Sequence, residues 1–127
     1  MIQTTSQTVF DGERNAVMQF TGVSDGTGQE TNVVKVSVSS LTNPCRRVAI
    51  KRIEYNISGG IVRLLWDDND PIEFLDLSDL GNDLNYKNIM GLQNIASNSA
   101  SGDVLFSTIG FDVGSAYTIK LDLIKKY

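Results

Sequence analysis

The chain contains no histidine, so the side chains left for chemistry are carboxylates, lysines, arginines and the single thiol of Cys45. Histidine is the usual general base near neutral pH and the commonest metal ligand. A Ser-His-Asp or Cys-His mechanism is therefore excluded. Carboxylate pairs for glycoside hydrolysis are available, but no spacing selects a pair. We expect no catalytic residue, and the chain is predicted not to be an enzyme.

The densest group of possible metal ligands is the turn Asp67, Asp68, Asn69 and Asp70. Oxygen ligands of this kind bind calcium. The spacing misses the helical calcium-loop pattern, which places glycine at the sixth position and glutamate at the twelfth. We interpret the turn as a polar cluster that keeps a sheet edge soluble, and its binding of calcium stays an open question. We predict no cofactor and no metal.

A short glycine-rich segment, residues 26–28, resembles a fragment of a phosphate-binding loop. Such a loop leads into a helix. Here the next periodic segment is a strand pattern that begins at Val34, so the segment is interpreted as a flexible hairpin loop.

Charge is unevenly distributed along the chain, whose net charge is -4. An acidic total argues against nucleic acid as the main partner, because binding to phosphates uses many lysines and arginines. The basic group is interpreted as the entrance of a strand, and the alternative is a contact patch for an acidic partner. The basic group is Arg46, Arg47, Lys51 and Arg52, and the acidic stretch is Asp67, Asp68, Asp70, Glu73, Asp76, Asp79 and Asp83.

The elements that must position these side chains are predicted to be strands. Apolar and polar residues alternate with a period of two over residues 16–21, 34–39, 104–108 and 117–123. Glycine and asparagine turns separate these runs, and helical periodicity is nearly absent. The pattern predicts an all-β fold, an antiparallel β-sandwich or jelly-roll-like barrel of about 7–8 strands. The segment 72–77 is apolar at both parities, which predicts a strand covered on both faces.

The stretch from Arg47 to Trp66 is predicted to organise the fold, because Gly59-Gly60 separates two β-rich runs. Two glycines favour a two-residue hairpin turn. In the expected register Tyr55 lies beside Leu64, and Trp66 lies on the same face of the ribbon. We therefore expect Tyr55 and Trp66 in the core and not in a sugar-stacking platform.

The 127 residues fit one domain, with no internal repeat or linker. Residues 1–6 are polar and unpatterned, which predicts an arm that becomes ordered only when it docks. Residues 78–102 have no clear period, and so long a loop is usually functional or docks on a partner. One cysteine permits no intramolecular disulfide. No stretch approaches about 20 apolar residues, so no membrane partner is expected.

Three segments together carry a resemblance to a known group of proteins: residues 21–38, 53–67, and 102–110 continuing to 117–121. They are similar to small β-rich structural proteins of tailed bacteriophages. The resemblance implies a virion component that is synthesised in the host cytoplasm, in particular a capsid decoration (cement) protein on the outside of the head. It also implies the major capsid protein as partner and a homo-oligomer, often a trimer around a symmetry axis.

A decoration protein would stabilise the head by bridging capsid subunits. The alternatives are a tail or fibre-attachment structural protein, and a carbohydrate-binding β-sandwich module that uses exposed aromatic residues and calcium. For contacts with the capsid we select residues from the end of the arm and from the irregular loop. They are Gln7, Val9, Phe10, Ile89, Met90 and Leu92.

Overall fold

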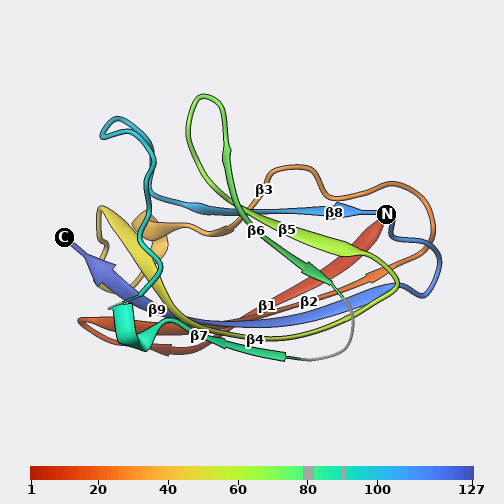
Figure 1. Cartoon of the computed structure of the whole chain (residues 1–127), viewed down its shortest axis with the longest axis horizontal. Helices are drawn as coiled ribbons and strands as arrows, with labels where there is room; N and C mark the ends of the chain where they lie inside the picture. Colours follow the sequence, from red (N-terminus) through yellow and green to blue (C-terminus); the bar gives the residue numbers. More distant parts are fainter. Residues whose placement is uncertain (79–81, 90) are drawn as a thin grey trace.

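The computed structural model describes residues 1–78, 82–89 and 91–127, which form two antiparallel sheets (Figure 1). The prediction of an all-β antiparallel sandwich is confirmed. One sheet has the strand order β1-β2-β9-β4-β7, and the other has the order β3-β8-β5-β6. The strands are β1 (Ile2–Asp11), β2 (Asn15–Ser24), β3 (Val33–Val36), β4 (Arg47–Ser58), β5 (Ile61–Trp66), β6 (Ile72–Ser78), β7 (Asn82–Asn85), β8 (Val104–Ile109) and β9 (Ala116–Lys126), with 3-10 turns η1 (Val38–Ser40) and η2 (Lys87–Ile89). None of the helical segments among these residues has the length and apolar character of a membrane span.

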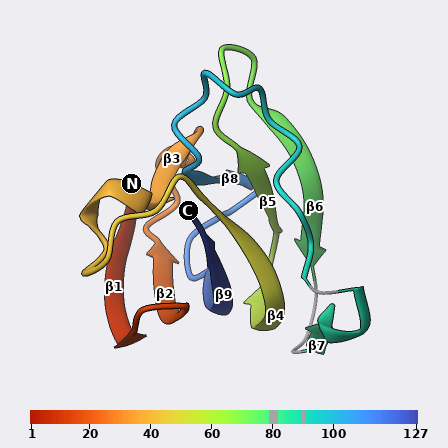
Figure 2. The same cartoon turned by 90° about the vertical axis from the view of Figure 1, so that its left-hand side faces the viewer.

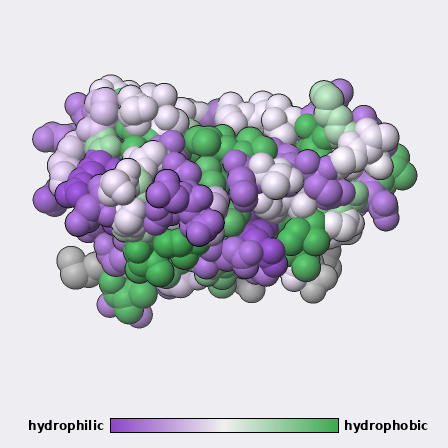
Figure 3. Space-filling view, turned by 90° about the horizontal axis from the view of Figure 1, so that it is seen from above, coloured by the Kyte–Doolittle hydropathy of each residue, from purple (hydrophilic) through white to green (hydrophobic). Residues whose placement is uncertain are grey.

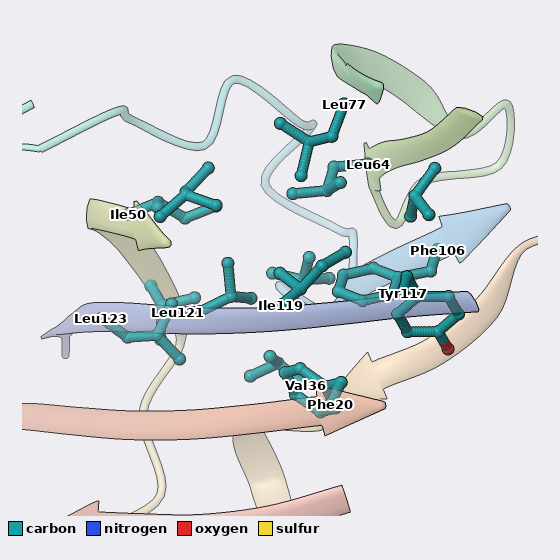
Figure 4. Close-up of a cluster of buried hydrophobic side chains, with 14 of the residues drawn as sticks. Phe20, Val36, Ile50, Leu64, Leu77, Phe106, Tyr117, Ile119, Leu121 and Leu123 are labelled. Atoms are coloured by element: carbon teal, nitrogen blue, oxygen red, sulfur yellow. The ribbon is translucent and has the colours of Figure 1, made fainter. Parts of the chain in front are cut away.

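The core lies between the two sheets and is built mainly from alternate side chains of the strands, although β1 contributes only Ile2. The predicted alternation in β9 is confirmed, because Tyr117, Ile119, Leu121 and Leu123 are all buried. From the opposite sheet, the ring of Phe106 meets Tyr117 edge-on, with 6.0 Å between the ring centroids (Figure 4). Edge-to-face contacts of this kind add to the stabilisation that burial gives.

The diglycine at Gly59-Gly60 connects the two sheets, and the predicted hairpin is wrong. β4 pairs with β9 and β7, whereas β5 pairs with β6 and β8. Tyr55 therefore lies opposite Ile119 and not opposite Leu64. Turn chemistry determines where the chain reverses. Which strands exchange hydrogen bonds depends on matching apolar alternation in distant strands, and here β9 matches β4 over almost its whole length.

The close packing around Gly60, where the chain passes from one sheet to the other, leads to a first testable prediction. A Cβ atom at Gly60 would lie 2.3 Å from Cδ1 of Phe111, whose ring is buried and packs edge-on against Tyr117. We expect Gly60→Ala to lower the free energy of unfolding by about 1 to 3 kcal/mol, the usual cost of overpacking. Urea denaturation measures the change. Ser58→Ala, an exposed position beside the same corner, is the control, and equal stability of the two variants would contradict the packing.

Residues 1–6 were expected to form a free arm, but residues 2–6 belong to β1, so that expectation is wrong. Ile2 pairs with Ser24 and is almost fully buried, and pairing with β2 continues to Asp11. Threonines favour extended structure, which supports the strand. The sequence of this strand has no hydrophobic periodicity, because every residue between Ile2 and Asp11 is exposed.

The expectation that both faces of β6 are covered is wrong, because Glu73, Asp76 and Ser78 are exposed. A bulge at Phe74 explains the apolar residues at both parities. Leu75 pairs with Leu64, whereas Glu73 pairs with Leu65, which leaves Phe74 as the extra residue. The bulge shifts the parity, so apolar positions before and after it lie on the same face of the strand.

Candidate interaction surface

The predicted contact residues on β1 are exposed. Val9 is 51% exposed and Phe10 is 55% exposed, and Gln7 on the same strand is also exposed. Val9 is the extra residue of a bulge, because Thr8 pairs with Met18 and Phe10 pairs with Val17. Val9 and Phe10 therefore place two adjacent apolar side chains in solvent at one end of the strand.

The predicted contact residues beyond β7 lie in different environments. Ile89, at the end of η2, is 63% exposed. Leu92 is half-buried, and its backbone exchanges two hydrogen bonds with Ile50, with N–O distances of 3.0 and 2.7 Å. Leu92 therefore anchors its loop to β4. Met90 lies outside the described residues.

The structure places these two groups at opposite edges of the five-stranded sheet and does not bring them into one patch (Figure 2). β1 is one end strand of that sheet, and β7, which leads into η2, is the other. Four strand spacings of about 4.8 Å separate the two edges by roughly 19 Å. The hydrophobic patches visible on the face of the four-stranded sheet are separated by polar side chains (Figure 3).

Between these edges, the outer face of the five-stranded sheet carries a row of polar residues that sequence reasoning missed. The register places Gln7, Gln19, Lys120, Glu54 and Asp83 side by side across all five strands. Only the cross-strand register reveals this row, because its members lie far apart in the sequence. An open groove of about 580 Å³ follows it, lined by Gln19, Arg52, Glu54, Tyr55, Asn56, Asp83, Thr118 and Lys120.

Ion pairs organise the charged side chains of this groove. Nε of Arg52 donates to Oδ1 of Asp83 at 2.8 Å, and a guanidinium nitrogen lies 3.2 Å from Oε1 of Glu54. Lys120 reaches the same Glu54 oxygen at 3.9 Å. The hydrogen bond from Arg52 lowers the pKa of the Asp83 carboxyl below its ordinary value. The face is therefore a charge-balanced, hydrogen-bonding surface suited to a polar partner.

The basic group of the sequence does not form one patch. The Arg47 guanidinium donates to the carbonyl oxygens of Asn94, Ala96 and Ser97 and thereby holds the loop before β8. Arg52 belongs to the groove described above. The structure therefore commits these two residues to contacts within the chain, which weakens the alternative of a basic docking patch.

The acidic turn after β5 is tied to the loop before β8. Asp68 accepts hydrogen bonds from the backbone N–H and the hydroxyl of Ser97, each at 3.0 Å. The bond from the backbone of Ser97 is the main reason that the pKa of Asp68 lies below its ordinary value. Asp67 accepts a hydrogen bond from the hydroxyl of Ser101. Among the described residues, no group of three or more His, Cys, Asp or Glu side chains is placed to hold a metal ion.

Neither of the two aromatic residues considered for a sugar-binding module is fully exposed. Trp66 is 1% exposed and stacks on Phe74, with 4.0 Å between the ring centroids. Tyr55 is half-buried and packs against the core. The expected core position of Trp66 is confirmed, and Trp66 offers no face for stacking of a sugar.

A buried ion pair lies between the sheets at β3. Nζ of Lys35 lies 2.6 Å from Oε2 of Glu30, and their side chains are only 5% and 9% exposed. The hydroxyl of Tyr117 donates to the other carboxylate oxygen at 2.6 Å. Burial and the hydrogen bond to Glu30 raise the pKa of Tyr117 well above its ordinary value. The segment that carries Glu30 passes from one sheet to the other, so the predicted hairpin loop at residues 26–28 is wrong.

A second buried ion pair joins the end of β9 to the β1–β2 turn. Nζ of Lys125 is 2.6 Å from Oδ1 of Asp11 and donates to the carbonyl oxygen of Gly12, also at 2.6 Å. The side chain of Lys125 is completely buried. Burial alone would raise the pKa of Asp11, but hydrogen bonds from Lys125 and from the backbone of Thr42 outweigh it, so that pKa lies below its ordinary value.

The comparisons with known proteins identify no family for this chain. No protein-family model matches the chain, and the searches of curated proteins and of solved structures gave no match. The functional proposal therefore depends on the surfaces described above and on the resemblance noted from the sequence.

Proposed function

We propose that this protein is a non-enzymatic capsid decoration protein of a tailed bacteriophage, which bridges neighbouring copies of the major capsid protein as a homo-oligomer. One observation carries the proposal. Exposed apolar side chains lie at two opposite edges of the same sheet, Val9 and Phe10 at β1 and Ile89 beyond β7. A bridging protein needs two separate contacts held at a fixed distance, and a five-stranded sheet with a packed core provides that spacing.

The polar face between the two edges is compatible with this role. The charged side chains Arg52, Glu54, Asp83 and Lys120 are paired within the chain, so the face stays soluble while the edges make contact. Each copy would bury apolar area on two capsid subunits. Repetition over the shell multiplies a modest gain per copy, because each contact raises the effective concentration of the next.

The number of copies per particle tests the location. We expect quantitative mass spectrometry of purified virions to give on the order of hundreds of copies, since stabilisation by repetition requires many. About a dozen copies or fewer would overturn decoration in favour of the tail or fibre-attachment alternative. Absence of the chain from the virion would overturn both.

Point variants test the two edges. Phe10→Ser and Ile89→Ser should each weaken binding to particles that lack the protein by roughly tenfold or more, because loss of a buried apolar side chain costs about 1.5 to 3 kcal/mol. Quantitative binding to such particles measures the effect. Val113→Ser, at a residue that is 78% exposed and belongs to neither edge, is the matched control. Unchanged binding of both edge variants would contradict the proposed contacts.

A further inference from the structure

We propose that the free edge of β1 pairs antiparallel with β1 of a second copy of this chain, about a two-fold axis at Thr5. The pairing joins two five-stranded sheets into one continuous sheet. The inference names an interface and does not depend on the proposed place in a capsid.

β1 offers an open edge over most of its length. It is an end strand of the five-stranded sheet (Figure 2), and residues 3–10 are exposed. The backbone N–H of Asp25 donates to the carbonyl of Met1 at 3.1 Å, which continues the β1–β2 ladder. In an antiparallel ladder, successive residues direct their N–H and C=O groups to opposite sides. The backbone N–H and C=O groups of odd-numbered residues up to Gln7 therefore form hydrogen bonds with β2. The backbone groups of Ile2, Thr4, Ser6 and Thr8 point to the free edge.

The other three sheet ends in the described part of the chain carry the features that normally prevent edge pairing. β3 and β7 are four residues long, and β3 contains a bulge. β6 follows Pro71, has a bulge and carries Glu73 and Asp76. β1 is ten residues long and has neither a charge nor a proline before Asp11. Natural proteins protect exposed edges with short strands, charges, prolines and bulges. β1 is protected only by the bulge at Val9, so residues 2–8 are the unprotected segment.

The composition of β1 identifies the occupant as a second copy. With the axis at Thr5, Thr5 faces Thr5, Gln3 faces Gln7, and Thr4 faces Ser6 of the other molecule. Threonine and serine pair favourably across strands, whereas like charges directly opposite each other are destabilising. The chain has a net charge of -4, yet this alignment brings no charged side chains opposite each other. β1 has no charge to attract a charged partner and no continuous apolar face for a helix, so an uncharged polar strand such as β1 itself fits best.

The axis position follows from the bulge. Two residues that lie directly opposite each other in an antiparallel pair direct their side chains to the same face of the sheet. When a two-fold axis normal to the sheet relates the strands, the axis therefore lies between the two copies of one residue. With the axis at Thr5, pairing covers residues 2–8 and stops before Val9, where the ladder with β2 changes register. Such an interface is isologous and closes with two copies.

Charge variants test the axis. We expect the wild-type protein to become dimeric as its concentration rises in sedimentation velocity, and Thr5→Lys and Thr5→Glu each to remain monomeric, because identical charges face each other. An equimolar mixture of the two variants should form a heterodimer. Asn56→Lys, in the same row of the sheet but on β4, adds the same charge away from the edge and should dimerise like wild type. Circular dichroism confirms that each variant is folded.

Amide exchange gives an independent readout. In the dimer, the amides of Ile2, Thr4, Ser6 and Thr8 should gain protection with rising protein concentration, while those of Gln3, Thr5 and Gln7 should already be protected at low concentration. A wild-type protein that stays monomeric at every concentration would overturn the proposal. So would dimerisation of Thr5→Lys as strong as that of wild type, or protection of β1 that does not depend on concentration.

Discussion

Asp11→Asn is expected to lower the free energy of unfolding by about 3 to 5 kcal/mol, because it leaves the ammonium group of Lys125 buried without its counter-charge. The lysine side chain is fully buried, and Asp11 supplies its only ion-pair partner among the described residues. The carbonyl of Gly12 still accepts a hydrogen bond from Lys125, but it carries no full charge. Chemical denaturation measures the loss.

The control and the double variant separate the charge from the local structure. Glu13→Gln changes an exposed acid in the same turn, and we expect it to alter stability by no more than about 0.5 kcal/mol. Adding Lys125→Met to Asp11→Asn should recover part of the loss, since the unpaired charge is then removed. A loss for Asp11→Asn as small as that for Glu13→Gln would contradict the role given to this ion pair.

The same pair predicts a dependence on pH. The pKa of Asp11 is lower in the folded chain than its ordinary value. A depressed carboxyl pKa stabilises the fold fully above the unfolded pKa of about 3.9, and the stabilisation is lost as the pH falls through the lower, folded value. The difference in stability between wild type and Asp11→Asn should therefore be constant near neutral pH and shrink in acid below about pH 4.

Glu30→Gln is the second substitution with a large expected effect. It removes the charge that balances Lys35 between the sheets, and we expect a loss of about 3 to 5 kcal/mol. The ammonium of Lys35 lies 6.0 Å from the ring centroids of Phe106 and Tyr117, but such contacts replace only part of an ion pair. Glu73→Gln, in the exposed pair with Arg63, is the control, and we expect it to change stability by less than about 1 kcal/mol.

The ionisation of Tyr117 gives a second measurement of the effect of Glu30→Gln, which is independent of the free energy of unfolding. The pKa of Tyr117 is raised first by burial and then by the hydrogen bond to the Glu30 carboxylate. A neutral amide at position 30 can still accept that hydrogen bond but no longer repels the phenolate, so Tyr117 should ionise at lower pH in Glu30→Gln. Ultraviolet titration of tyrosinate measures this shift. An unchanged titration curve would contradict the contact between Tyr117 and Glu30.

The sequence predicted most of the strands that bury one face against the core, but it missed β7, whose Leu84 packs against the core. Tyr117 to Leu123 alternate as a half-buried strand does, and the structure confirms it. Periodicity failed for β1, which is exposed on both faces beyond Ile2, and for β6, where the bulge at Phe74 shifts the parity. It also could not show that Gly59-Gly60 leads from one sheet into the other, because strand pairing depends on distant partners.

The candidate site was predictable only in part. Val9, Phe10 and Ile89 were selected as contacts, and all three are exposed, but their places at opposite edges depend on the strand order. The polar row and the Asp11–Lys125 ion pair join residues far apart in the chain, whereas Glu30 and Lys35 are close in sequence but belong to a loop and to β3. No local pattern marks them, because each charge looks like an ordinary surface charge until the fold is known.

The position of β9 between β2 and β4 has a consequence for biosynthesis. The other strands of the five-stranded sheet cannot complete it before β9 is made, because β9 follows them in the sequence and fills the centre of the sheet. The four-stranded sheet has the same arrangement, because β8 lies between β3 and β5. Non-local pairing of this kind slows folding and leaves strand edges open in the nascent chain. The edges of β2 and β4 that pair with β9 therefore stay open until β9 has been translated.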